Sequence, residues 1–265
     1  MKKYVPRSHG DNRMNHEGDT SRARNKYYLR DNPNLASLLY HRFNWMNAFI
    51  NKDSIGIEVG AGTGVSKEYI KSINFKTTDF ADNKWLDHKM IDALNTGFKK
   101  ESFDFVVSSN MIHHVPYPTK FFEEMSRILK PGGKLIIQEI NCSFFMKLLL
   151  RVMRHEGFDY TIDVFDKNKV CTDENDLWSA NCAIPNLLFD DIEVFKSKFK
   201  YFKVEHTSYS EFFLFINSGG VISKTSYIPL ASILNKLVRI TDSVLIKLSP
   251  KTFALQRQIV LAKNK

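Results

Sequence analysis

Residues 57–64 read Ile-Glu-Val-Gly-Ala-Gly-Thr-Gly, a short run that joins a predicted strand to a predicted helix. The strand is expected over residues 54–59 and the helix from Val65 onward. Three glycines in this run permit a tight turn and let a ligand come close to bare backbone. Backbone N–H groups at the start of the helix would face the same turn and suit polar ligand atoms. We therefore expect a ligand site at this turn.

Segments of alternating type surround this turn along the chain. An amphipathic helix is predicted over residues 119–129, and further strands are predicted over residues 75–78, 89–91, 103–108 and 134–140. Strands that alternate with helices are typical of an α/β fold in which helices cover both faces of a parallel sheet. Two later segments, 201–206 and 211–216, are predicted as the last strands.

Composition and charge divide the chain into three parts. With 43% hydrophobic and 25% charged residues, it has the composition of a globular protein. Residues 1–30 are predicted to be a flexible basic segment, with eight basic and three acidic groups. Residues 31–217 are predicted to form the α/β domain. Residues 218–265 are predicted to be a basic segment built around an amphipathic helix over 229–248.

The net charge of +9 belongs to the two ends of the chain. Residues 221–265 carry eight basic groups and one acidic group, whereas the stretch 31–220 is net acidic. A domain that grips a nucleic-acid backbone needs a continuous basic face, so we predict no nucleic-acid partner. The C-terminal helix leaves two interpretations open: peripheral contact with an anionic membrane, or packing on the sheet or in a dimer seam.

The three cysteines, Cys142, Cys171 and Cys182, form no CxxC pair. Neither a disulfide framework nor a metal site is therefore expected. Unpaired cysteines fit the reducing cytoplasm, and membrane contact by the C-terminal helix would add peripheral attachment at the inner face of the membrane. Residues 1–19 have positive charge but no apolar core, and so predict no secretory signal.

Two carboxylates follow the predicted second and third strands. Asp79 comes fifteen residues after Gly64, where an acidic side chain can accept hydrogen bonds from the two hydroxyls of a ribose. That role fits NAD and S-adenosylmethionine equally. Asp92, which Ala93 follows, is placed to accept a hydrogen bond from the exocyclic amine of adenine or, alternatively, to cap a turn.

In order and spacing, the segments IEVGAGTG, FDFVVSSNMIHHV and LKPGGKLIIQE, with Asp79 and Asp92-Ala93, resemble a class I S-adenosylmethionine-dependent methyltransferase of the type 11 kind. The resemblance covers residues 54–140 as the cofactor half and leaves residues 141–190 as an acceptor insertion that begins with a helix. It implies a Rossmann-like three-layer sandwich with a seven-stranded, mostly parallel sheet and an antiparallel last strand.

The resemblance also implies a role for each matching residue. The glycine-rich loop would face the amino-acid part of the cofactor, and Glu58 would orient that loop. Asp79 would hold the ribose, with Phe80 against the adenine and Asn110 near the sulfonium. The residues expected to bind S-adenosylmethionine are Glu58, Gly60, Ala61, Gly62, Thr63, Gly64, Asp79, Phe80, Asp92, Ala93, Asn110 and Met111.

Candidate acceptor residues follow the fourth and fifth strands. His114 and His155 are candidate general bases, because an acceptor hydroxyl must lose a proton. The residues expected to line the acceptor pocket are Asp159, Tyr160, Trp178 and Asn181. A solvated acidic loop and a buried position for Trp178 are the alternatives. Residues 155–191 resemble, more distantly, bacterial methyltransferases of surface-polysaccharide assembly, which implies a nucleotide-linked or lipid-linked sugar as acceptor.

The sequence therefore predicts methyl transfer from S-adenosylmethionine to a hydroxyl, or less favourably an amine, of a small or sugar-based acceptor. One alternative is an NAD-dependent oxidoreductase, which Val65 disfavours because the dinucleotide fingerprint has a third glycine there. The other is an inactive cofactor-binding membrane or partner module, which the intact glycine loop disfavours. Nucleic-acid methylation is disfavoured because no Asn-Pro-Pro-aromatic motif follows the fourth strand.

Overall fold

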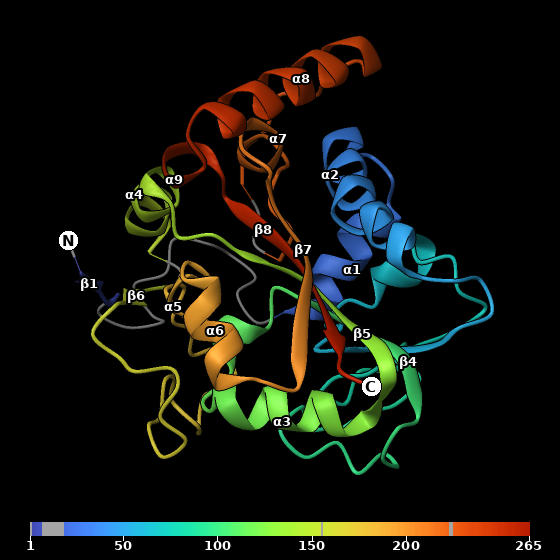
Figure 1. The fold of residues 1–265 in the computed structure, drawn as a ribbon. Coiled ribbons are helices and arrows are strands. Elements are labelled where there is room, and N and C mark those ends of the chain that lie inside the picture. Colours follow the sequence, from blue (N-terminus) through green and yellow to red (C-terminus); the bar gives the residue numbers. More distant parts are fainter. Residues whose placement is uncertain (1, 7–18, 155, 223–224) are drawn as a thin grey trace.

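The computed structural model describes residues 2–6, 19–154, 156–222 and 225–265 (Figure 1). Within them, a six-stranded sheet has the strand order β3-β2-β4-β5-β8-β7, and a two-stranded pair, β1-β6, lies apart from it. The strands are β1 (Lys3–Tyr4), β2 (Ile55–Val59), β3 (Asn74–Thr77), β4 (Phe103–Ser109), β5 (Leu129–Ile140), β6 (Phe158–Asp159), β7 (Phe202–Ser210) and β8 (Gln256–Lys263).

Helices connect these strands. The α-helices are α1 (Thr20–Tyr28), α2 (Pro33–Asn44), α3 (Pro118–Ile128), α4 (Phe144–Met153), α5 (Ile184–Phe189), α6 (Ile192–Lys198), α7 (Phe213–Ile216), α8 (Ser232–Leu248) and α9 (Pro250–Phe253). In the described part of the chain, three 3₁₀ helices accompany them: η2 (Trp45–Phe49), η3 (Val65–Glu68) and η4 (Ile112–His114). Helix α2 begins at Pro33, because the Asn32 side chain accepts a hydrogen bond from the Leu35 N–H and the proline suits the first helical position.

Strands β3, β2, β4 and β5 run parallel, and β8 is antiparallel to both of its neighbours, β5 and β7. The predicted α/β class, with a mostly parallel sheet and an antiparallel last strand, is confirmed. Parallel strands end at one edge of a sheet, so the segments that follow Val59, Ser109 and Ile140 meet there. The glycine-rich loop, the two-histidine segment and the start of the acceptor insertion are these three segments.

The sheet has six strands among the described residues, not the seven expected. The predicted strand at 89–91 is absent, and an isolated parallel bridge between Thr78 and His88 lies just before it. Met90 has a φ angle of +55°, which an extended strand cannot contain, and its side chain points into solvent.

The prediction of a strand over 211–216 is wrong. Helix α7 occupies this segment because the Asp242 carboxylate accepts hydrogen bonds from the N–H groups of Phe212, Phe213 and Leu214. This partner lies about thirty residues away, so a local pattern cannot reveal it. The last strand is instead β8, which lies between β5 and β7, and the sheet therefore extends beyond residue 217, where the sequence placed its end.

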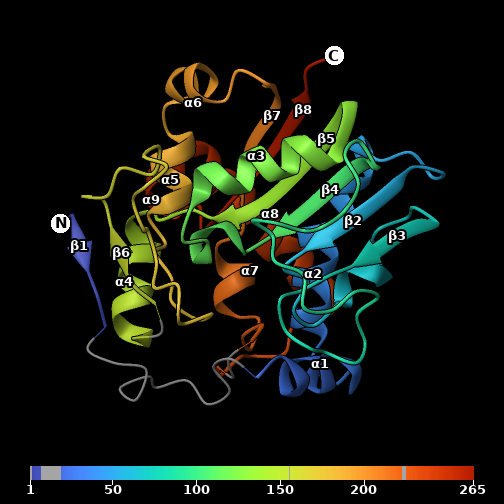
Figure 2. The same ribbon diagram turned by 90° about the horizontal axis from the view of Figure 1, so that it is seen from below.

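Both faces of the sheet are covered, as Figure 2 shows for α3, α5 and α6 on one face and α1 and α2 on the other. Successive residues of one strand serve opposite faces. Val106 packs in the cluster with Phe122 of α3, whereas Phe105 and Val107 pack in the cluster with Leu39 of α2. This two-sided burial explains why the strands are continuous apolar runs.

The sequence predicted a flexible segment over residues 1–30, but parts of this segment are folded. Residues 20–28 form helix α1, whose start is capped by Asp19, and Tyr27 is buried against the α2 face of the sheet. Lys3 and Tyr4 form β1, which pairs with β6 in the acceptor insertion. The N-terminal residues on either side of 7–18 therefore belong to the folded body.

Helix α8 is present as predicted, but its apolar stripe does not pack on the sheet. Asn235, Asp242 and Ile246 are its buried residues, whereas Leu237 and Val244 are about half exposed. In Figure 1, α8 lies along the upper edge of the molecule, next to α9 and above α4. Among the described residues, none of the helices is both long enough and apolar enough to span a bilayer.

Candidate functional site

The glycine-rich loop leaves strand β2 at the edge of the sheet where the parallel strands end. Gly60 and Gly62 have φ angles of +69° and +49°, a region that residues with a Cβ rarely adopt. A Cβ on Gly60 would lie 2.3 Å from Cγ of Met111. A Cβ on Gly62 would meet, among the described residues, only the Thr20 methyl group, at 3.7 Å. Space above this part of the loop is therefore open to a ligand.

The helix after the loop is shorter than predicted. It is the single 3₁₀ turn η3, and no side chain of the residues that the structure describes caps its start at Gly64. The bare loop backbone, more than a helix dipole, is thus what the site offers to a ligand.

Asp79 ties the loop to the end of strand β3. Its Oδ2 accepts a hydrogen bond from the Gly62 N–H at 2.8 Å, and its Oδ1 accepts one from the Ala81 N–H at 2.9 Å. A carboxylate has about four acceptor positions, so both oxygens retain capacity for ribose hydroxyls. Phe80 is 53% exposed beside it, which leaves its ring open to a flat base. These positions fit the roles expected for ribose and adenine.

Glu58 lies buried beneath the loop, where it accepts a hydrogen bond from the Ser66 hydroxyl. Burial raises the pKa of Glu58 to about 8, against the opposing effect of the Ser66 hydrogen bond and with a further rise from the charge of Asp79. Its backbone carbonyl accepts hydrogen bonds from both the N–H and the hydroxyl of Thr78. These contacts fit the predicted loop-orienting role of Glu58.

Helix α1 and Trp85 hold the outer side of the loop, and the sequence reasoning missed both. Arg24 Nη1 donates to the Thr63 carbonyl at 2.6 Å, and Trp85 Nε1 donates to the Gly62 carbonyl at 2.9 Å. The Arg24 guanidinium also lies over the Trp85 ring, 5.3 Å from its centroid. Residues 20–28 contain both Arg and Tyr, and this mixture was the one feature of the sequence that could have indicated the helix. The sequence analysis instead assigned these residues to the flexible basic segment.

The remaining predicted cofactor residues lie in two places. Met111 covers Gly60, and the neighbouring Asn110, with a φ angle of +51°, accepts a hydrogen bond from Gln256 at 2.8 Å. Asp92 caps a turn, since its Oδ1 accepts from the Leu94 N–H at 2.8 Å. Ala93 packs against the core cluster of α3. The turn alternative for Asp92 is therefore present, and its adenine contact stays a prediction.

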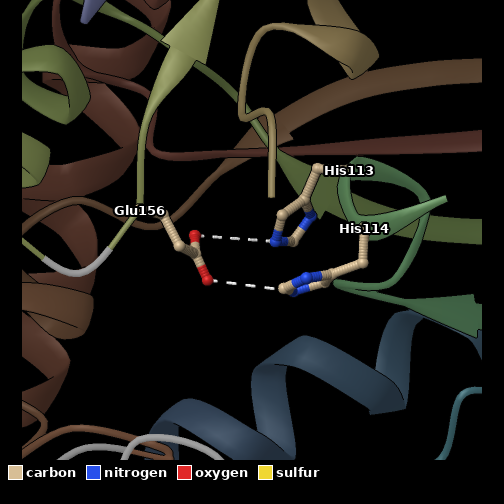
Figure 3. Close-up of side chains that lie close together, drawn as sticks. All are labelled: His113, His114 and Glu156. Carbon is tan, nitrogen blue, oxygen red and sulfur yellow. Dashed lines mark ion pairs between the residues drawn. The ribbon is translucent and has the colours of Figure 1, made fainter. Parts of the chain in front are cut away.

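His113, His114 and Glu156 converge just beyond Met111 (Figure 3). Nε2 of His113 lies 3.7 Å from Glu156 Oε2, and Nε2 of His114 lies 3.8 Å from Glu156 Oε1. On its other side, Nδ1 of His113 lies 2.6 Å from Oε1 of the fully buried Glu139. Nδ1 of His114 donates to the Ser179 carbonyl at 3.1 Å, because a carbonyl can only accept.

The two histidines differ in charge. Burial lowers the pKa of His113, but the charge and hydrogen bond of Glu139, helped by Glu156, outweigh it and raise that pKa to about 10. Burial and the charge of His113 lower the pKa of His114 to about 4. At neutral pH, His113 is an imidazolium and His114 is neutral. Nε2 of His114 is then an acceptor, as a proton-accepting group requires.

The same three side chains raise the question of a metal, which the sequence reasoning did not expect. Their ligand atoms lie within 4.8 Å of one another, a spacing that could hold a divalent cation. A ligand nitrogen must be deprotonated. The proton that Glu139 and Glu156 hold on His113 would therefore have to leave first.

A cavity of about 250 Å³ opens in the acceptor insertion beside Glu156. Three of the four predicted residues line it, namely Asp159, Trp178 and Asn181. Tyr160 does not, because its ring packs in the cluster around α4 and its hydroxyl donates to the Cys142 carbonyl. His155 lies outside the described residues. The sequence reasoning did not select Glu156, although Glu156 adjoins His155 in the acidic loop.

The wall of this cavity is bonded to the two-histidine segment. The Asn181 N–H donates to the His113 carbonyl at 2.8 Å, and the Thr172 hydroxyl donates to the His114 carbonyl at 2.8 Å. The His114 ring meets the edge of Trp178, with 6.2 Å between centroids. The two-histidine segment, whose neighbour Met111 covers Gly60, is thus hydrogen-bonded to the wall of the cavity.

Comparison with known proteins agrees with this geometry. Residues 57–137 match the family model described as a methyltransferase domain, Methyltransf_11. The match identifies residues 57–137 as part of a methyltransferase domain. The cofactor of such a domain is S-adenosylmethionine, and the match favours methyl transfer over the NAD-dependent oxidation considered from the sequence. The match includes the glycine-rich loop, Asp79 and the two-histidine segment.

Individual relatives are similar to this chain over limited lengths. Fusarin C synthetase of Gibberella fujikuroi is 28% identical over 129 residues, which is 40% of this chain and 3% of that protein. The uncharacterized protein MJ1123 of Methanocaldococcus jannaschii is 30% identical over 99 residues, which is 34% of this chain and 47% of that protein. The chain therefore spans less than half the length of either relative.

Among solved structures, a SAM dependent methyltransferase from Archaeoglobus fulgidus is similar with a TM-score of 0.49 and 12% identity. The similarity covers 86% of this chain and 94% of that one.

Proposed function

We propose that this chain transfers the methyl group of S-adenosylmethionine to a hydroxyl of a small polar or sugar-based acceptor. The observation that carries the proposal is the position of neutral His114, which lies beside Trp178 of the acceptor cavity and three residues after Met111, the residue that covers Gly60 of the glycine-rich loop. An amine acceptor is the less favoured variant, because a neutral amine is a stronger nucleophile than a hydroxyl and needs a base less.

The glycine-rich loop, Asp79 and Phe80 hold the cofactor in this proposal. The open backbone at Gly62 receives its amino-acid part, and the Asp79 carboxylate accepts from the ribose hydroxyls. Bound S-adenosylmethionine supplies an electrophilic methyl group on a sulfonium. The chain therefore has to align the acceptor oxygen with that methyl and keep water away.

The acceptor hydroxyl would donate to Nε2 of His114. The Ser179 carbonyl fixes the tautomer that leaves this nitrogen as an acceptor. As the acceptor oxygen takes the methyl group, the sulfur–methyl bond would break, S-adenosylhomocysteine would be left, and the hydroxyl proton would pass to Nε2. The resulting imidazolium is stabilised by Glu156, whose Oε1 already lies 3.8 Å away.

The cavity lining supports a sugar among polar acceptors. Trp178 offers an aromatic ring, and Thr172, Ser179 and Glu156 surround it with hydroxyl and carboxylate groups. Aromatic surface with a few convergent polar groups is the usual composition of a small-ligand pocket. A nucleotide-linked or lipid-linked sugar is the acceptor class to test first, and the cytoplasm is the compartment in which we propose that it acts.

The test has two stages. Calorimetric titration with S-adenosylhomocysteine, with NAD as the comparison ligand, establishes whether the chain binds the cofactor product. Transfer of labelled methyl from S-adenosylmethionine to a panel of sugar nucleotides and lipid-linked sugars, read by mass spectrometry, then identifies the acceptor. Binding of S-adenosylhomocysteine without transfer to any hydroxyl or amine would favour the inactive binding module instead.

A further inference from the structure

Helix α8 carries an apolar stripe that none of the described residues covers. Six of its nine large apolar side chains are exposed, with exposed fractions from 47% to 75% (Ile233, Leu234, Leu237, Ile240, Val244 and Leu248). Five of them recur every three or four residues, which places them on one side of a helix that turns about 100° per residue. The buried residues Asn235, Asp242 and Ile246 fall on the opposite side. The stripe thus points directly away from the body of the molecule.

The exposed charges of α8 have one sign. Lys236, Arg239 and Lys247 are exposed, and they follow one flank of the apolar stripe. Asp242 is the acidic residue of this helix, and it is buried, where it accepts three backbone hydrogen bonds from residues 212–214. The outer surface of α8 therefore presents apolar and basic groups together.

Helix α4 repeats this pattern. Phe144, Leu148 and Val152 are exposed at intervals of four residues, and Met146 and Leu150 are buried on the opposite side. Residues 143–154 contain no acidic side chain and three basic ones. Both helices contact α9, and the inner sides of α4 and α8 belong to one apolar cluster, so the two surfaces lie on the same part of the molecule (Figure 1).

We propose that α8, with α4 beside it, docks this protein on an anionic lipid bilayer. A helix that lies in the membrane interface inserts an apolar face and keeps basic side chains at the level of the headgroups. Lys and Arg at that depth are attracted to anionic lipids. The binding surface consists of the exposed apolar residues of α8 and α4 together with Lys236, Arg239 and Lys247.

Charge favours a membrane over a second copy of the chain. In a twofold contact, the same patch is used by both copies. Lys236, Arg239 and Lys247 would then lie at a contact in which the α8 helix of the other copy exposes no carboxylate to pair with them. An anionic surface neutralises these groups, whereas self-association brings like charges together.

Vesicle sedimentation of the full chain tests the proposal, with phosphatidylcholine vesicles prepared with and without phosphatidylglycerol. We expect binding that requires the anionic lipid. The double variant Leu237→Ser/Val244→Ser should weaken it by roughly tenfold or more, because two apolar insertions are lost. The double variant Lys236→Gln/Lys247→Gln should also weaken vesicle binding by roughly tenfold, since each basic group near the membrane surface is attracted to the anionic headgroups.

Ile73→Ser is the matched control, because Ile73 is 67% exposed and lies outside α4 and α8. It should bind vesicles like the unaltered chain. Absence of binding to anionic vesicles, or equal binding by all variants, would overturn the proposal. A dimer in sedimentation velocity that Leu237→Ser/Val244→Ser dissolves would assign the surface to a second copy instead. Titration with S-adenosylhomocysteine shows separately that each variant is folded and that the cofactor site is intact.

Discussion

Nδ1 of His113 and Oε1 of Glu139 lie 2.6 Å apart in the core of the protein. The other oxygen of Glu139 accepts hydrogen bonds from the N–H groups of Met111 and Ile112. One buried carboxylate at the end of β5 therefore holds both the segment that covers the glycine-rich loop and the first histidine. This link couples the position of the cofactor loop to that of the candidate base.

Replacing Glu139 with Gln should destabilise the protein by about 3 kcal/mol, because it leaves the His113 imidazolium buried without its closest countercharge. Urea unfolding measures the loss. The matched control is Glu205→Gln, which removes an exposed partner of Lys134 and should cost less than about 1 kcal/mol. Equal losses of unfolding free energy in the two variants would show that the buried pair stabilises the protein no more than an exposed pair does.

The same pair predicts how stability depends on pH. The pKa of His113 rises from an ordinary value of 6.5 to about 10 on folding. Its contribution to stability is thus fully present below pH 6.5 and is lost as the pH rises toward 10. The free energy of unfolding should fall across this window, and the His113→Gln variant should show a smaller fall. A flat profile in the unaltered chain would contradict the raised pKa.

His114→Gln should lower kcat by about a hundredfold or more, with unchanged binding of S-adenosylhomocysteine, if the neutral imidazole takes the acceptor proton. Because the pKa of His114 is about 4, its protonation should not limit the rate above about pH 5. Single-turnover methyl transfer with an identified acceptor measures both effects. His206→Gln, which changes a histidine on β7, is the control. A fall in cofactor affinity without a change in the rate of methyl transfer would mean that His114 helps to bind the cofactor and does not act as the base.

Much of the cofactor half could be predicted from the sequence, because its determinants are local. The strand before Gly60, the strand after Phe103 and the helix before Leu129 all show apolar spacing that burial then confirms. The glycine-rich loop and Asp79 follow from the ends of such strands. Three of the four predicted pocket residues also line the cavity, since the insertion is short and starts from a predictable strand.

The errors have non-local causes. A carboxylate about thirty residues away, Asp242, turns the predicted strand at 211–216 into helix α7. Strand β8 was not foreseen because it completes the sheet from the far end of the chain. Glu156 could not be identified as a site residue from the sequence, because only the fold brings it to His113 and His114. The same holds for Arg24, whose contact with the Thr63 carbonyl depends on the fold.

Asp79→Asn should reduce the affinity for S-adenosylhomocysteine by about tenfold or more, because hydrogen bonds from the ribose hydroxyls to a charged carboxylate are lost. Calorimetric titration measures the change. The control is Asp82→Asn, since Asp82 is exposed and pairs with Lys89 at 2.9 Å. Equal affinities in the two variants would mean that Asp79 serves the loop rather than the ligand.

Arg24→Ala tests whether helix α1 is part of the cofactor site. Arg24 is the residue of α1 that donates to the loop backbone at Thr63 and lies over Trp85, which in turn donates to the Gly62 carbonyl. Its loss should release one charge-assisted hydrogen bond and loosen the loop. We expect a severalfold decrease in affinity for S-adenosylhomocysteine, at roughly 1.5 kcal/mol for such a bond.

Two further measurements separate a cofactor role of Arg24 from a general loss of folding. Arg22→Ala changes the neighbouring exposed arginine of the same helix, and its affinity should equal that of the unaltered chain. Trp85 lies against the loop, so its fluorescence should respond to S-adenosylhomocysteine in the unaltered chain and respond less in Arg24→Ala. If Arg24→Ala binds the ligand normally while protease cuts α1 faster, the helix stabilises the N-terminal segment and takes no part in holding the cofactor loop.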